Sequence, residues 1–122
     1  MLLNPNSDKP IFLQFAEELE KDILEGIFEE ESQIPSTTEV AIKFKINPAT
    51  ANRGVNLLVD EGIIYKKRGI GMFVATGART KIIEKRKTAF FDSYILPLIK
   101  ESMNLNISEK EIIAMIEKGY RK

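Results

Sequence analysis

Apolar residues recur at helical spacing in the first part of the chain. Between Pro10 and Glu25, five large apolar side chains fall on one helical face: Ile11, Phe12, Phe15, Leu19 and Ile23. Gly26 follows at once, and glycine is common just beyond a helix end. The pattern predicts a core-forming support helix from about Pro10 to Glu25. A short strand or extended link at residues 27–28 and a loop at 29–32 are expected next.

Two shorter helical patterns follow, joined by a tight turn. Ser36 and Glu39 form an S-x-x-E capping box, which predicts a helix that begins just after Ser36 and ends near Lys45. Asn47 is a favourable N-cap and Pro48 suits the first helical position, so a second helix should run from there to Gly62. Two short helices with about three residues between them form a helix-turn-helix.

A basic β-hairpin is expected after the second of these helices. Residues 63–67 are typical of a strand, 68–71 of a turn and 72–75 of the returning strand. Phe73 and Val74 should face the core beneath the hairpin. Gly69-Ile70-Gly71 lacks the following helix of a dinucleotide-binding loop, so its glycines are better explained by a tight tip. A helix-turn-helix followed by such a hairpin is a winged helix.

The remaining residues predict two helices with too much apolar surface for their size. Pro97 should kink or interrupt the first, and Ser108 with Glu111 forms a second capping box that opens the other. A two-helix hairpin cannot bury so many large side chains alone, so we expect a homodimer. Leu57 and Val59 could pack under this tail. The expected fold is mainly α with a small β-hairpin (α+β): a winged helix-turn-helix over 1–76 and a two-helix dimerisation tail over 77–122.

Composition excludes several classes of function. The 122 residues are 43% hydrophobic and 30% charged, which suits one globular domain with at most a small appendage. Without Cys or His, the usual nucleophile–base pairs and most transition-metal sites are missing, so we expect no enzyme and no cofactor. No apolar run approaches a membrane span and the first residues lack a signal pattern, so we expect a cytoplasmic protein without a membrane partner.

Charge is balanced overall but unevenly distributed. The net charge is zero, yet residues 17–31 hold eight acidic residues and one lysine, whereas residues 43–68 hold six basic and two acidic ones. The basic set falls on the second helix of the pair and the hairpin, as phosphate binding would require. The alternative is that both runs are merely solvated faces.

Three ordered segments of the chain resemble the GntR family of bacterial transcription regulators: PIFLQFAEELEKDILEG, IPSTTEVA and INPATANRGVNLLVDEGIIYKKRGIGMFV. The Asn-Pro-x-Thr opening at Asn47, the following Arg53 and the short tail resemble its YtrA subfamily. The resemblance implies a homodimeric regulator, usually a repressor, that binds an inverted-repeat operator in double-stranded DNA. The chain departs from the family at 29–32, where a proline-glycine turn is usual, and at Thr38 and Asn52, where relatives carry arginine.

Candidate DNA contacts follow from residue type and position. The expected phosphate contacts are Ser36, Thr37, Thr38, Lys43, Lys66 and Lys67, with the helix N-terminus at Asn47. Major-groove contacts to bases are expected from Asn47, Ala49, Thr50, Asn52 and Arg53, and minor-groove contacts from Arg68 and Gly69. Two alternatives are an ordinary amphipathic helix and a winged helix that binds another protein, which would need an apolar recognition face.

A dedicated effector domain is not expected, because only a short tail follows the hairpin. Any small-molecule effector would bind at the dimer interface or between tail and winged helix. Its plausible polar contacts there are Tyr94, Arg79 and Arg86.

Overall fold

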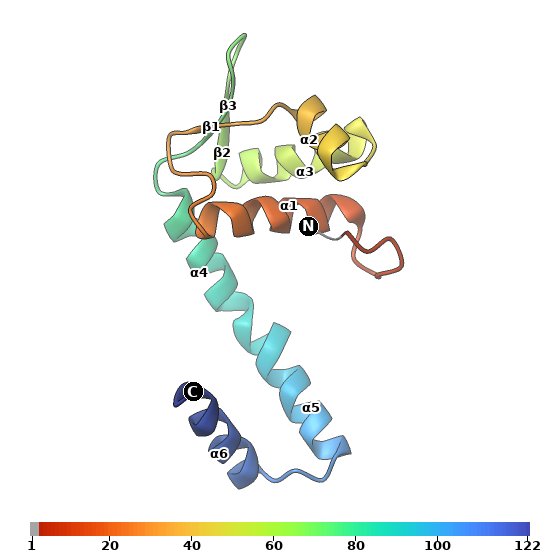
Figure 1. Cartoon of the computed structure of the whole chain (residues 1–122), viewed down its shortest axis with the longest axis vertical. Helices are drawn as coiled ribbons and strands as arrows, with labels where there is room; N and C mark the ends of the chain where they lie inside the picture. Colours follow the sequence, from red (N-terminus) through yellow and green to blue (C-terminus); the bar gives the residue numbers. More distant parts are fainter. Residues whose placement is uncertain (1–2) are drawn as a thin grey trace. The chain divides into compact units, whose positions relative to one another are not determined.

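The computed structural model describes residues 3–122 and is mainly helical, with one small sheet (Figure 1). Its elements in chain order are α1 (Ile11–Leu24), β1 (Gln33–Ile34), α2 (Thr37–Phe44), α3 (Pro48–Asp60), β2 (Ile64–Lys67), β3 (Gly71–Val74), α4 (Ala78–Phe90), a π-helix (Phe91–Ile95), α5 (Leu96–Asn104) and α6 (Glu109–Tyr120). The chain forms two compact units, Met1–Glu84 and Lys85–Lys122. Among the described residues, no helix is long and apolar enough to cross a membrane.

The helix-turn-helix is formed by α2 and α3, as predicted. The Ser36 hydroxyl accepts from the Glu39 N–H at 3.1 Å, and the Glu39 carboxylate accepts from the Ser36 N–H at 3.1 Å, which completes the capping box. Lys45 then takes a left-handed conformation (φ 54°) that ends α2. Asn47 Oδ1 accepts from the Ala49 N–H at 2.7 Å, which caps α3. Both helix starts are therefore determined by local side-chain hydrogen bonds.

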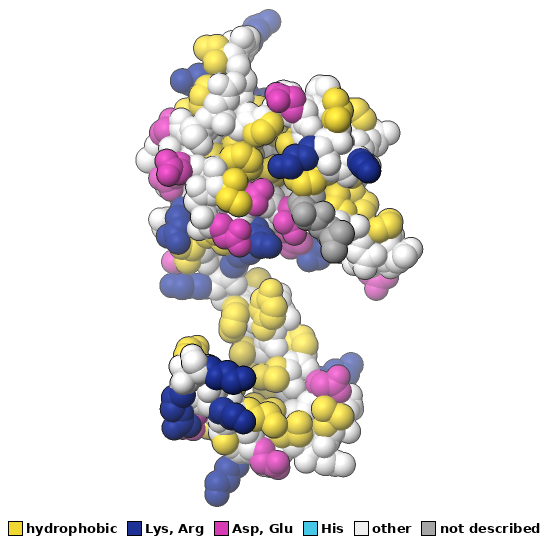
Figure 2. All heavy atoms as spheres, in the orientation of Figure 1, with side chains coloured by type: hydrophobic (Ala, Val, Ile, Leu, Met, Phe, Trp, Pro, Cys, Tyr) yellow, Lys and Arg dark blue, Asp and Glu magenta, His cyan; other side chains and the backbone are white. Residues whose placement is uncertain are grey.

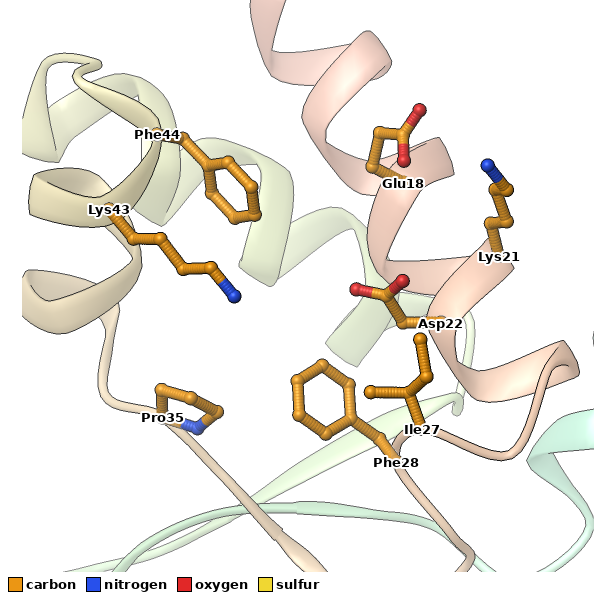
Figure 3. Close-up of a pocket in the computed structure, with 8 residues that line it drawn as sticks. All are labelled: Glu18, Lys21, Asp22, Ile27, Phe28, Pro35, Lys43 and Phe44. Atoms are coloured by element: carbon orange, nitrogen blue, oxygen red, sulfur yellow. The ribbon is translucent and has the colours of Figure 1, made fainter. Parts of the chain in front are cut away.

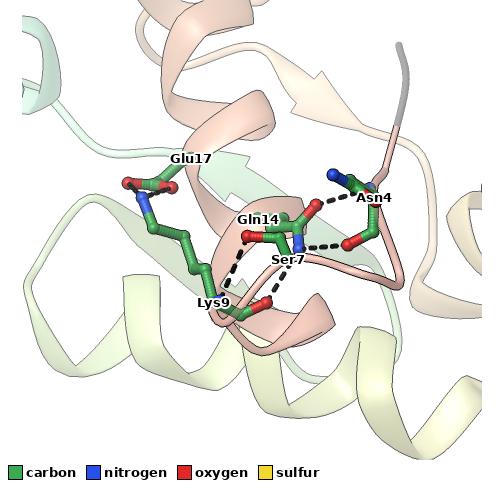
Figure 4. A network of polar contacts seen from close by, with 5 residues as sticks. All are labelled: Asn4, Ser7, Lys9, Gln14 and Glu17. Atoms are coloured by element: carbon green, nitrogen blue, oxygen red, sulfur yellow. Dashed lines mark hydrogen bonds and ion pairs between the residues drawn. The ribbon is translucent and has the colours of Figure 1, made fainter.

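The N-terminus of α1 is held by the segment before it rather than by a cap residue. Pro10 makes no side-chain cap bond. Instead, Gln14 accepts from the Asn4 N–H at 2.7 Å and donates to the carbonyls of Asn4 and Lys9 at 2.9 and 2.8 Å (Figure 4). Lys9 also pairs with Glu17 at 2.8 Å. The segment before α1 thereby folds back onto its first turns.

The sheet contains three antiparallel strands in the order β1-β3-β2. The β2–β3 hairpin pairs Ile64 with Val74 and Lys67 with Gly71, and it projects beyond the helices of the first unit as the wing (Figure 1). The third strand, β1, was not predicted; residues 27–28, where a strand was considered, lie outside the sheet. Because β1 has only two residues, its pairing with β3 leaves no periodic pattern in the sequence.

The prediction for Phe73 is wrong, and that for Val74 is confirmed. Val74 and Met72 are buried, whereas Phe73 is partly exposed on the opposite face of β3. Successive residues of a strand point to opposite faces, so Phe73 and Val74 could not both enter the core. Phe73 instead stacks on Tyr65 of β2, with ring centroids 5.6 Å apart.

The core of the first unit extends into α4. Ala78 and Ile82 are fully buried in the same cluster as Phe15, Val55 and Leu58. The first compact unit therefore ends at Glu84, beyond the boundary at residue 76 that the sequence suggested. Leu57 and Val59, expected to pack under the tail, are partly buried against this cluster.

Close packing of α1 on α3 depends on Gly54. A Cβ at this position would lie 2.6 Å from Phe15 Cδ2 and 2.9 Å from the Phe12 carbonyl oxygen. Both distances are far below an ordinary contact, so a larger residue would push the two helices apart. Glycine allows α1 to support α3 at short range.

The second unit consists of helices with many exposed apolar side chains. Pro97 lies in the first turn of α5, directly after the π-helix, so the chain departs from regular α-helix where an interruption was predicted. The Ser108–Glu111 capping box opens α6 as expected. We define the tail apolar surface as the side chains that are at least 38% exposed here: Phe90, Phe91, Tyr94, Leu96, Leu98, Ile99, Met103, Leu105, Ile113, Met115, Ile116 and Tyr120.

Candidate nucleic-acid interface

The exposed face of α3 carries the predicted base-contacting residues. Ala51, Val55 and Leu58 are fully buried, so the helix is held by its opposite side. The outward positions are small or polar, and they comprise Asn47, Ala49, Asn52 and Arg53, with Thr50 and Asn56 partly buried. Short hydrogen-bonding side chains beside an arginine suit the major groove, where they can reach base edges.

Arg53 is supported by an aromatic ring of α1. Its guanidinium carbon lies 3.9 Å from the centroid of the Phe12 ring, which is a cation–π contact. This contact restrains a long side chain before any ligand binds, so less conformational entropy is lost on forming a hydrogen bond. Phe12 was predicted only as a core residue; its sequence position gave no sign of this role.

Two lysines of β2 make contacts that brace the wing, one with α3 and one within the hairpin. Lys66 of β2 donates to Asn56 Oδ1 of α3 at 2.9 Å, which ties the wing to α3. The Lys67 Nζ lies 4.8 Å from the Phe73 ring centroid and 5.9 Å from that of Tyr65. At the exposed tip, Gly69 takes φ 77°, a conformation that favours glycine, and Arg68 precedes it. The wing therefore presents three consecutive basic residues on a braced hairpin.

Three hydroxyl groups at the N-terminus of α2 differ in how readily they could donate a hydrogen bond to a phosphate. Ser36 uses its oxygen as an acceptor in the capping box, which leaves its O–H able to donate to a phosphate. Thr38 is exposed, whereas the Thr37 hydroxyl lies 3.7 Å from the Met72 sulfur and is partly buried. Of the three predicted hydroxyl contacts, Thr37 is the least accessible.

The structure does not bring Lys43 together with the wing lysines. It extends into a groove of about 650 Å³ between α1 and α2, toward Asp22 and Phe28 (Figure 3). Burial raises the pKa of the Asp22 carboxyl above its ordinary value of 3.8, Glu18 raises it further, and Lys43 acts in the opposite direction. Lys43 thus lies beside the acidic side of α1. The phosphate contact expected of Lys43 stays a prediction, and its side chain points away from the wing toward this groove (Figure 3).

The other charged side chains of residues 3–122 do not form a metal site. Within residues 3–122, no cluster of three or more acidic side chains is arranged to hold a metal ion. Lysine and arginine side chains lie at the wing tip and also over α6, and apolar side chains gather over the second unit (Figure 2). A helix-turn-helix with a basic wing defines a winged-helix protein whose polar face and wing suit nucleic acid.

Comparisons with known proteins agree with this class. The sequence profile described as "Bacterial regulatory proteins, gntR family" matches residues 13–74. The HTH-type transcriptional repressor YtrA of Bacillus subtilis is 31% identical over 86 residues, which cover 70% of this chain and 66% of that protein. The chain belongs to the GntR family of transcription regulators, and it is not an enzyme.

Solved structures share the fold over different lengths. A GntR-family regulator from Bacteroides thetaiotaomicron is 38% identical, with a TM-score of 0.74, and the match covers 92% of this chain and 97% of that one. The DNA-binding domain of AraR, solved in complex with operator ORX1, is 28% identical with a TM-score of 0.56. That match covers 62% of this chain and 93% of the AraR chain. The predicted fold class and the resemblance to YtrA-type regulators are confirmed.

Proposed function

We propose that this regulator binds an inverted-repeat operator as a homodimer and represses transcription in the cytoplasm. The observation that carries the proposal is the polar face of α3, with Arg53 stacked on Phe12 and a basic wing tied to the same helix through Lys66 and Asn56. The operator complex of the related AraR domain supports a DNA target. The name of the YtrA repressor supports the direction of regulation.

Each α3 would enter one major groove. Asn47, Ala49, Asn52 and Arg53 would then face base edges, with Thr50 at the margin of the contact. Ser36, Thr38, Lys66 and Lys67 would contact phosphates, while Arg68 and Gly69 would enter the adjacent minor groove. In a twofold dimer, the two recognition helices would lie about 34 Å apart, one turn of DNA.

A second copy of the chain is the proposed occupant of the tail apolar surface. Tyr94 is 65% exposed, Met103 71% and Tyr120 88%, which is unusual for one short segment of a monomer. A twofold interface would bury such side chains on both copies at once. The alternative of a winged helix that binds a different protein through α3 is less well supported, because the exposed face of α3 is polar.

Arg53→Ala should weaken operator binding by about 1–3 kcal/mol, or roughly 5- to 150-fold, and should reduce discrimination between bases at one position. The loss follows from removing a restrained guanidinium from the major-groove face. Binding to duplexes with single base-pair changes would measure both effects. Lys43→Ala is the matched control, because it removes one cation from the same unit and faces the groove beside Asp22. An equal loss on every sequence would identify Arg53 as a phosphate contact and contradict its proposed role in base recognition.

A further inference from the structure

Glu31 takes a backbone conformation that side chains rarely adopt. Its φ is 65°, in the left-handed region, where only Lys45 and Asn106 accompany it among described residues other than glycine. A glutamate has no intrinsic preference for this region, so the surrounding contacts must hold it there. Its N–H donates to the Val74 carbonyl at 2.7 Å, which fixes the loop against the end of β3.

The Glu31 carboxylate joins two other segments of the first unit. Oε1 accepts from the Tyr65 hydroxyl of β2 at 2.6 Å, and Oε2 accepts from the Thr76 N–H at 2.9 Å and its hydroxyl at 2.6 Å. These bonds connect the base of the wing with the residues just before α4. The Thr76 and Tyr65 hydroxyls lower the pKa of the Glu31 carboxyl below its ordinary value, so the charged acceptor is the favoured form.

Glu30, the preceding residue, caps the start of α4. One oxygen accepts from the Gly77 N–H at 3.0 Å and the other from the Arg79 N–H at 3.1 Å. These two backbone bonds are the main reason that the pKa of Glu30 is lowered. Amide groups at a helix N-terminus lack partners within the helix, and here a carboxylate distant in sequence supplies them. Arg79 Nε also donates to the Leu24 carbonyl at 3.4 Å, which adds a contact to the end of α1.

Together these contacts fix how α4 begins relative to the wing. We call Glu30 and Glu31 the carboxylate pair. Ile82 anchors the next turn of α4 in the core, and the helix then continues to Phe90, past the end of the first unit at Glu84. Since α4 is the covalent connection to the second unit, its direction of exit constrains where a dimer can place the two recognition helices.

We propose that the carboxylate pair consists of positioning residues that set which half-site spacing the dimer accepts. The inference rests on the proposed binding of an operator by a homodimer. Neither carboxylate contacts DNA in this account; each acts through β2 and the first turn of α4. Shifting one half-site by a base pair rotates it about the DNA axis as well as moving it along, so a dimer whose α4 helices leave the winged helices in a fixed direction would reject the change.

The test uses full-length protein and duplexes that carry two half-sites at spacings changed in steps of one base pair. The main variant is Glu30→Ala/Glu31→Gly, in which glycine keeps the left-handed backbone without strain. Glu29→Ala is the matched control, because it removes one carboxylate from the same exposed loop. A single half-site duplex measures intrinsic affinity separately. Glu31→Gln, which keeps the size of the side chain and one acceptor oxygen, provides a milder second variant.

Wild type and Glu29→Ala should prefer one spacing by about 10-fold over its neighbours, whereas the double variant should bind all of them within about 3-fold. Its affinity for the single half-site should stay within about 2-fold of wild type, and Glu31→Gln should give an intermediate profile. A double variant with the wild-type profile, or one that loses half-site affinity as strongly as operator affinity, would overturn the inference. A wild type without any spacing preference would also overturn it. Wild type that binds every two-half-site duplex no more tightly than the single half-site would instead refute dimeric operator binding itself.

Discussion

A chain shortened to end at Glu84 is expected to fold and yet bind a two-half-site operator about 100- to 10,000-fold more weakly than the full chain. The first unit keeps its whole core, including Ala78 and Ile82. It loses the tail apolar surface, so each winged helix would bind its half-site independently. Titration of both proteins against the same duplex would measure the difference, and sedimentation would show whether the shortened chain is a monomer.

A chain that ends at Thr76 serves as the comparison for this truncation. It lacks Ala78 and Ile82 and should be poorly folded, so its loss of binding would have a different cause. Circular dichroism would separate the two cases. Full operator affinity in the chain that ends at Glu84, or a monomeric full-length chain at micromolar concentration, would contradict a dimer built on the tail.

Ile82→Ala should destabilise the winged helix by about 2–5 kcal/mol, although the residue lies outside residues 13–74, which match the family profile. Its side chain is fully buried, and truncation would leave a cavity between α4 and the rest of the core. For a unit of this size, the melting temperature should fall by roughly 10 °C or more. Thermal unfolding followed by circular dichroism would measure it.

Ile83→Ala is the matched control for Ile82→Ala. The two residues are neighbours on α4 with the same side chain, but Ile83 is only partly buried. Ile83→Ala should therefore lower the free energy of unfolding by clearly less than Ile82→Ala. Equal losses at the two positions would mean that the start of α4 does not belong to the core of the first unit.

Elements with local signals were predictable from the sequence. The α2 and α6 starts follow from the capping boxes at Ser36 and Ser108, and α3 follows from the cap at Asn47. Such caps involve residues at most three positions apart, so their chemistry can be read directly. The wing could also be predicted from the sequence, because two short strand patterns flank a turn that contains Gly69.

Features that depend on tertiary contacts were not predictable. The strand β1 exists only because β3 lies beside it, so no local pattern marks it. Phe73 is different, because the alternation of a strand by itself places Phe73 on the face opposite Val74. The direction of Lys43 toward Asp22 depends on how α1 and α2 pack. The stacking of Arg53 on Phe12 joins residues 41 positions apart (53 − 12), a distance at which sequence spacing carries no information.

DNA binding through the wing is tested by a salt titration of full-length protein on duplex DNA, with Lys67→Ala and Lys43→Ala beside wild type. Each phosphate contact releases condensed counterions, so log affinity should fall linearly with log salt concentration. Lys67→Ala should flatten that slope by about one unit for each bound protomer, while Lys43→Ala should leave it unchanged. Affinity that does not depend on salt, or a slope that Lys67→Ala leaves intact, would contradict DNA binding through the wing.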